Sequence, residues 1–279
     1  MRPQMTTGVP ARFVYNAALF MWSAPEITAI IASSAAAGVM NAMAGGGTIL
    51  TFPTLLLLGE PAITANATST VALLPGAASS MAGYRQEVVR HREWLKTLFV
   101  PSLVGGAIGS VLLLSTPEKT FANLAPLLIL FATVLFMLQG ALTHRGDGDR
   151  KRRLNRWRWG MASLFQLGVA VYGGYFGAGI GILMLAVLGF MGVENIHAAN
   201  GLKNFFGICI NSVAAAYFIY RGAVDWPVAL IMIAGATAGG YGGARFARHI
   251  GRQKARTAVV VIGFLVTVFL FLYQRLNHS

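Results

Sequence analysis

The chain has 279 residues, of which 56% are hydrophobic and 11% charged, and its formal net charge is +13. Soluble domains carry about 25% charged residues, so this composition indicates an integral membrane protein. The single cysteine, Cys209, excludes an intrachain disulfide and cysteine-based metal clusters, and no histidine pair has metal-ligand spacing. We therefore expect no cofactor and no metal site.

The basic residues are clustered. Residues 85–96, 143–158 and 245–256 together hold 16 of the 22 Lys and Arg residues. Clusters of this kind mark the cytoplasmic loops of membrane proteins, whereas a nucleic-acid-binding surface would spread its charges along a groove. We expect the lipid bilayer, and no nucleic acid, as the partner of this chain.

The apolar segments follow one another along the whole chain. Residues 1–25 contain a patch too short to span a bilayer, which predicts an N-terminal interfacial segment. Two later segments are the longest, and both are interrupted by glycines. The long apolar segments lie at about 27–58, 62–84, 97–115, 120–142, 159–188, 195–220, 226–245 and 256–274.

The glycine interruptions are the candidate binding site. The first contains Gly45, Gly46, Gly47 and Thr48, and the second contains Gly177, Gly179 and Gly181. Each glycine lowers helix stability by roughly 1 kcal/mol relative to alanine, so both stretches are expected to leave the helix. Hydrocarbon tolerates such backbone only beside protein or a cavity. A helix that restarts there presents free N–H groups and a positive dipole end to an anion.

The two interrupted segments belong to an internal repeat with an offset of 133 residues. Identical pairs include Gly46/Gly179, Ile49/Ile182 and Leu50/Leu183. Equivalent loops of the two halves differ in charge. The basic loop 85–96 corresponds to the weakly charged turn at 221–225, and the neutral pair Glu118–Lys119 corresponds to the basic loop 245–256. This bias predicts inverted copies, as in secondary transporters.

The expected fold is therefore an all-α integral membrane protein with two inverted repeats. Each repeat is a glycine-broken re-entrant hairpin followed by three transmembrane helices. After the interfacial segment at 1–25, we expect the first membrane repeat at 26–142, a basic cytoplasmic loop at 143–158 and the second membrane repeat at 159–279.

A polar helix start follows each predicted hairpin. The first contains Asn66, Thr68, Ser69 and Thr70, and the second contains Asn200, Lys203 and Asn204. Lys203 lies about nine residues beyond Glu194, on the order of 13 Å deep. A lysine there costs roughly 2.5 to 3.5 kcal/mol, so we expect it to face a cavity that holds water or an anion. The alternative is a lysine that extends along its stem to the membrane interface.

At these residues the chain resembles the TauE/SafE family of sulfite and sulfonate permeases, also called TSUP, over about residues 28–275. The resemblance rests on G-G-G-T-I-L-T-F-P, L-L-L-L-G-E-P, A-N-A-T-S-T and V-D-W. It implies a multi-pass carrier in the bacterial inner membrane that moves small anions such as sulfite and organosulfonates.

We predict secondary transport of a small oxyanion, either a sulfur-containing anion or a carboxylate. An anion channel is an alternative, and an intramembrane enzyme is a weaker one, because all nine acidic residues lie in loops or near segment ends. Four points stay open at this stage: the identity of the anion, import or export, proton coupling through Lys203 or uniport, and the oligomeric state, for which a homodimer is one option.

Overall fold

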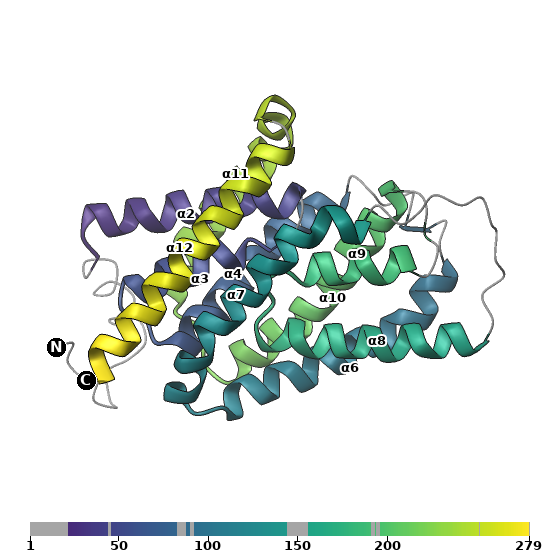
Figure 1. Ribbon diagram of the computed structural model, residues 1–279, viewed down its shortest axis with the longest axis horizontal. Helices are drawn as coiled ribbons and strands as arrows, with labels where there is room; N and C mark the ends of the chain where they lie inside the picture. Colours follow the sequence, from purple (N-terminus) through teal and green to yellow (C-terminus); the bar gives the residue numbers. More distant parts are fainter. Residues whose placement is uncertain are drawn as a thin grey trace.

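The computed structural model describes residues 22–43, 46–82, 88–89, 92–143, 156–190, 193, 196–250 and 252–278. These residues form helices joined by short turns, without a strand among them, so the predicted all-α class is confirmed for the described chain (Figure 1). Residues 1–21, which include most of the expected interfacial segment, lie outside the described residues. The same holds for Gly45 and for residues 144–155 of the expected basic loop.

The helices occur in two similar series. Each series has a helix of 20 residues, a helix of 10 or 11 residues and three helices of 21 to 27 residues. The first series is α2 (Ala24–Met43), α3 (Thr48–Leu57), α4 (Ala62–Ala82), α6 (Arg92–Ser115) and α7 (Glu118–Thr143). The second is α8 (Arg156–Tyr175), α9 (Ile180–Phe190), α10 (Ile196–Tyr220), α11 (Trp226–Ile250) and α12 (Arg252–His278).

Both long glycine-containing segments are interrupted. The first break, residues 44–47, separates α2 from α3, and the second break, residues 176–179, separates α8 from α9. Gly46 has φ 93° and Gly179 has φ 78°, in the left-handed region that only glycine enters at little cost. The equivalent glycines of the repeat thus take the same unusual backbone conformation. The prediction that these stretches leave the helix is confirmed at both glycines.

Two acidic residues cap helices. The N–H groups of Ala62 and Ile63 at the start of α4 donate to the Glu118 carboxylate. The N–H of Val228 donates to Asp225 Oδ1 at 3.1 Å and so caps α11. Carboxylates stabilise helix N-termini because the first N–H groups lack intrahelical acceptors. Helix α7 begins at Glu118, so the loop that the sequence predicts at Glu118–Lys119 lies instead at residues 116–117.

Helices α6 and α8 form a close glycine-lined seam. A Cβ atom on Gly105 would lie 2.5 Å from Ala170 Cβ, and one on Gly109 would overlap the Val171 carbonyl oxygen. At the start of the two helices, the rings of Trp94 and Trp159 are 4.7 Å apart. The residue numbers of the contacting positions increase in the same direction along both helices, so α6 and α8 run parallel.

Helices α2 and α11 form the equivalent seam. Cβ atoms on Gly235 and Gly239 would overlap Ser34 Oγ and the Ala35 carbonyl oxygen, respectively, and one on Gly38 would lie 2.8 Å from the Gly240 nitrogen. These helices are therefore also parallel. Gly105, Gly109 and Gly239 thus allow the close helix packing that small residues give in membrane proteins.

A third helix runs parallel to each seam. Phe99 of α6 stacks on Phe205 of α10 at 6.2 Å, and a Cβ on Gly106 would lie 2.9 Å from the Ile210 carbonyl oxygen, so α10 is parallel to α6. Likewise Asp225 N–H donates to Thr68 Oγ1, and Gly76 faces Ala236, so α4 is parallel to α11.

We call α2, α4 and α11 the first trio, and α8, α10 and α6 the second trio. Each trio takes one helix from the other half of the chain, and the trios pack on each other through α4 and α10. Helices α7 and α12 run side by side across the molecule (Figure 1).

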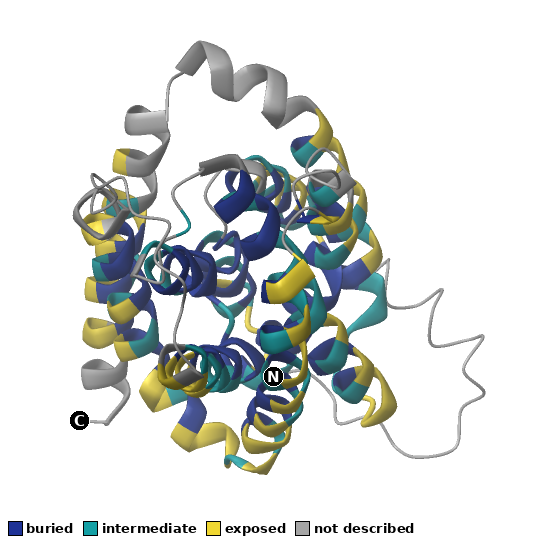
Figure 2. Cartoon of the chain, turned by 90° about the vertical axis from the view of Figure 1, so that its right-hand side faces the viewer, coloured by how far each residue is buried: buried dark blue, intermediate teal, exposed yellow. Residues whose placement is uncertain are grey.

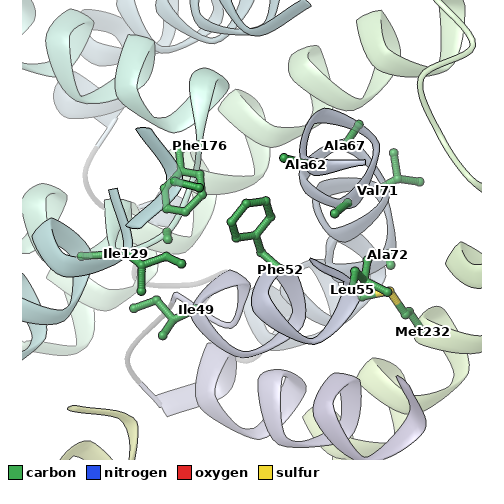
Figure 3. Packing of buried hydrophobic residues seen from close by; sticks show 14 of the residues in the cluster. Ile49, Phe52, Leu55, Ala62, Ala67, Val71, Ala72, Ile129, Phe176 and Met232 are labelled. Atoms are coloured by element: carbon green, nitrogen blue, oxygen red, sulfur yellow. The ribbon is translucent and has the colours of Figure 1, made fainter. Parts of the chain in front are cut away.

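An aromatic cluster joins α3, the second break and α7. The Phe52 ring of α3 packs edge-on against Phe176 of the second break, with ring centroids 5.2 Å apart (Figure 3). It also packs against Phe121 of α7 at 6.1 Å. All three rings are buried. Edge-to-face aromatic pairs add about 0.5 to 1.5 kcal/mol beyond burial, so this cluster holds the broken segments in place.

The outer surface of the bundle is apolar. Exposed large side chains include Phe99, Val104 and Ile108 on α6 and Leu265 and Phe269 on α12, while buried residues gather in the centre (Figure 2). Among the described helices, Arg92–Ser115, Glu118–Leu138 and Ala198–Tyr220 are long and apolar enough to cross a membrane. An apolar exterior of this extent fits lipid and not water.

Candidate functional site

A cavity of about 70 Å³ lies where the two breaks, α4 and α10 meet. The first break contributes Gly46, and Asn41 and Thr48 flank it. The second break contributes Gly177. The other lining residues are Thr70, Leu73 and Ala77 of α4, Ile180, Gly181 and Met184 of α9, and Lys203, Asn204, Gly207, Ile208 and Asn211 of α10.

The two breaks touch each other at the cavity. A Cβ atom on Gly46 would lie only 3.3 Å from the backbone nitrogen of Gly179. The N–H of Gly47 donates to Asn41 Oδ1 at 2.8 Å, so a side chain of α2 holds the first break. The starts of α3 and α9 both border the cavity through Thr48 and Gly181. Two helix N-termini, which carry the positive ends of the helix dipoles, therefore border one small space.

Lys203 is the one charged side chain among the described residues that line the cavity. It is 4% exposed and thus does not extend to the lipid-facing surface. Thr70 is its equivalent in the repeat, and both line the same cavity from neighbouring helices. An ammonium group, amides and a hydroxyl beside two helix N-termini favour a small anion.

The cavity is small. Pockets for drug-sized molecules have volumes of about 300 to 1,000 Å³, whereas one water occupies about 30 Å³ of liquid. The 70 Å³ found here suits an ion with few heavy atoms.

The structure brings half of the predicted site residues to the cavity. The predicted residues in the lining are Gly46, Thr48, Thr70, Gly177, Gly181, Lys203 and Asn204. Gly47, Gly179 and Asn200 are outside it, although the first two belong to the breaks. Thr68 accepts the Asp225 N–H bond, which directs its hydroxyl to the start of α11. Successive helical residues are rotated by 100°, so Thr68, Ser69 and Thr70 cannot all face one cavity.

Asn66 and Ser69 are buried on α4 beside the second break but outside the cavity lining. Asn66 Nδ2 donates to the Tyr175 carbonyl oxygen at 3.1 Å. Ser69 is fully buried. Asn66 therefore supports the second break, and neither of these two predicted residues lines the cavity that contains Lys203.

Sequence reasoning missed Asn41 and Asn211, which both line the cavity. A signal for Asn211 exists in the sequence, because Asn204, Gly207, Ile208 and Asn211 follow helical spacing and form one stripe with Lys203. Asn41 sits in the last turn of α2, directly before the first break. A polar side chain next to a glycine break is a comparable signal.

A bundle of apolar helices with two broken helices around a buried polar cavity is the architecture of membrane transporters. The chain belongs to the TauE/SafE family, since the family profile described as "Sulfite exporter TauE/SafE" matches residues 30–270.

Its relatives include a "Probable membrane transporter protein" of Haemophilus influenzae, 32% identical over 87% of this chain and 93% of the relative. "Probable membrane transporter protein ORF9" of Sinorhizobium sp is 26% identical over 83% and 87% of the two chains, and "Probable membrane transporter protein YfcA" of Escherichia coli K12 is 25% identical over 89% and 91%. No solved structure matches the chain. These names indicate a membrane transporter rather than an enzyme.

Proposed function

We propose that the protein is a secondary transporter that moves a small oxyanion, such as sulfite or a short organosulfonate, across the bacterial inner membrane. The observation that carries the proposal is the cavity between the two breaks, which Lys203 lines together with the starts of α3 and α9. Family membership supports the anion class, and the apolar exterior supports the membrane location.

We also propose that the two halves are inverted copies. The directions of the helices support this. A five-residue turn joins α10 to α11, so these two helices run in opposite directions, and the trios that contain them do so as well. Equivalent helices, such as α4 and α10, belong to different trios and are therefore antiparallel.

The same directions support re-entrant hairpins. The last residue of α8, Tyr175, lies beside Gly109, far along α6, whereas α10 starts near the beginning of α6 and runs parallel to it. The intervening α9 must therefore bring the chain back to the side on which α8 began. With the basic clusters in the cytoplasm, α8 and α9 would enter and leave on the cytoplasmic side.

This topology predicts opposite labelling of two equivalent positions. In a Cys209→Ser background, a cysteine at Lys119 is expected to react with a membrane-impermeant maleimide from outside intact cells. A cysteine at the equivalent Arg252 is expected to react only after the membrane is opened. A third cysteine at exposed Arg221 should behave like that at Lys119. Reaction of the first two positions from the same side would exclude the inverted arrangement.

The cavity itself is tested by Gly207→Leu. Gly207 lines the cavity, and a Cβ atom there meets nothing within 4 Å, so a leucine is expected to fill part of the cavity. Replacing a glycine within a helix also improves helix propensity by up to about 1 kcal/mol. We expect a folded, inserted protein that has lost at least about tenfold in affinity for sulfite, measured by isothermal titration calorimetry.

Gly168→Leu is the matched control, because Gly168 is exposed on α8 and also has open space at its Cβ position. Sulfate, thiosulfate, acetate and short sulfonates measured beside sulfite define the anion. Wild-type affinity in Gly207→Leu would place the binding site elsewhere. Transport that fails to saturate with concentration in proteoliposomes would favour a channel.

A further inference from the structure

Three buried side-chain oxygens beside the second break have no hydrogen-bond partner. They are Asn66 Oδ1, Ser69 Oγ and Asn211 Oδ1. Asn66 is 1% exposed and Ser69 is fully buried. An unsatisfied buried polar atom is costly, and most such atoms in folded proteins have a protein, water or ion partner. Three of them in one region therefore point to a bound ligand.

Two of the three residues contact the second break, and the third is a helical neighbour of one of them. Asn66 is held against the Tyr175 carbonyl by its Nδ2 group, and Ser69 lies one helical turn further along α4. Asn211 Oδ1 approaches from α10 and lies 4.0 Å from the Cβ position of Gly177. Asn66 and Asn211 thus reach the segment Tyr175–Gly177 from two helices. Ser69 shares a face of α4 with Asn66, because residues three apart in a helix lie on the same side.

The backbone at this place is also rich in acceptors. The N–H groups of Phe176 and Gly177 both donate to the Tyr172 carbonyl, at 2.9 and 3.3 Å. Within the described segment 173–190, the carbonyls of Gly173 and Gly174 consequently accept no backbone hydrogen bond. The C-terminal end of α8 carries the negative end of the helix dipole. Carbonyl and amide oxygens at a helix C-terminus attract a cation and repel an anion.

We propose that the second break binds a sodium ion through Asn66 Oδ1, Ser69 Oγ, Asn211 Oδ1 and the free carbonyls at the end of α8. The side-chain ligands are neutral oxygens without a carboxylate, which suits a hard monovalent cation better than Ca²⁺ or Mg²⁺. Discontinuous transporter helices hold coupling ions with unwound carbonyls in this manner.

The sodium ion would lie next to the anion cavity, since Asn211 would bind the ion and also lines the cavity. Lys203 precedes Asn211 by eight residues on α10, about 12 Å along the helix. An anion in the cavity would therefore lie between two positive charges, at Lys203 and at the second break. Sodium binding does not depend on the anion, but co-transport of sodium with the anion rests on the function proposed above.

Thermal unfolding of the purified full-length protein in detergent, without any oxyanion, tests the site. NaCl is titrated against choline chloride at constant ionic strength, with LiCl and KCl as further arms. We expect a saturable rise of the wild-type melting temperature with Na⁺ and a smaller one with K⁺. Ser69→Ala and Asn211→Ala are each expected to weaken the apparent Na⁺ affinity about tenfold or more.

Ser69→Ala should fold and be at least as stable as the wild type in choline chloride, because it deletes only an oxygen without a partner. Asn211→Ala also removes the amide nitrogen, so its melting temperature in choline chloride is measured as its own reference. Ser34→Ala is the control, since Ser34 is buried but already donates to the Ile31 carbonyl. It should keep the full Na⁺ response. Equal effects of Na⁺ and choline, or a wild-type Na⁺ response in both variants, would show that water fills this site and overturn the proposal. Sulfite binding in choline chloride tests the anion site separately.

Discussion

Lys203→Met is expected to weaken the affinity for the transported anion by about ten- to a hundredfold. Lys203 supplies the one full positive charge among the described lining residues, while each helix end contributes only about half a charge. Hydrogen bonds to charged groups contribute roughly 1.5 to 3 kcal/mol, which corresponds to this loss. Methionine has a similar length and is comfortable in an apolar interior, so folding and membrane insertion should be retained.

The measurement is the apparent affinity for sulfite in proteoliposomes, together with direct binding to the purified protein. Lys96→Met is the matched control, because Lys96 is exposed in the first part of α6 and far from the cavity lining. Lys203→Arg should retain part of the affinity because it keeps the charge. Unchanged affinity in Lys203→Met would show that backbone and hydroxyl groups form the anion site alone.

Gly46→Leu is expected to abolish anion binding and also to lower thermal stability, whereas Gly179→Leu should abolish binding with a smaller stability loss. Both glycines have positive φ, which costs other residues roughly 1 to 2 kcal/mol. At Gly46 a Cβ atom would in addition lie 2.6 Å from the Phe136 ring. At Gly179 the nearest atoms, those of Ala132, are 3.5 Å away, an ordinary contact distance.

A second substitution separates the cost of the positive φ at Gly46 from the cost of the contact with the Phe136 ring. Gly46→Leu combined with Phe136→Ala removes the ring that the leucine would strike, so melting temperature should recover in part relative to the sum of the single changes. Anion binding should stay lost, because the backbone conformation and the space at the first break are still altered. Normal sulfite binding in both Gly46→Leu and Gly179→Leu would show that the breaks serve packing only.

The sequence predicted the broken helices because glycine has a direct effect on backbone conformation. Gly46 and Gly179 were equivalent positions in the repeat, and they contact each other in the structure. The repeat offset also paired Thr70 with Lys203, and both line the cavity. Both features can be predicted from a single sequence, because they depend on the conformational preference of glycine and on the offset of the repeat.

The positions of hydroxyl and amide side chains were harder to predict, because they depend on which face of a helix meets which neighbour. Thr68 belongs to a polar run, yet its hydroxyl binds the N–H of Asp225, which lies 157 positions later. Asn211 belongs to the helical stripe that contains Lys203, but the spacing alone does not show that this stripe meets the second break. Glycine spacing likewise shows that a helix packs closely against another helix, but not which one. It therefore does not predict that α6 packs on α8 and α2 on α11.

The exchange of helices between the trios has a consequence for biosynthesis. The face of α2 that contains Ser34 and Gly38 is covered by Gly235 and Gly240 of α11, which lie about 200 residues later in the chain. At a synthesis rate of roughly 5 to 20 residues per second, α2 would wait about 10 to 40 s for its partner after entering the membrane. During that interval its small-residue face is open to lipid, to the insertion machinery or to another nascent chain. The first half of the protein therefore cannot complete its own packing before the second half has been translated.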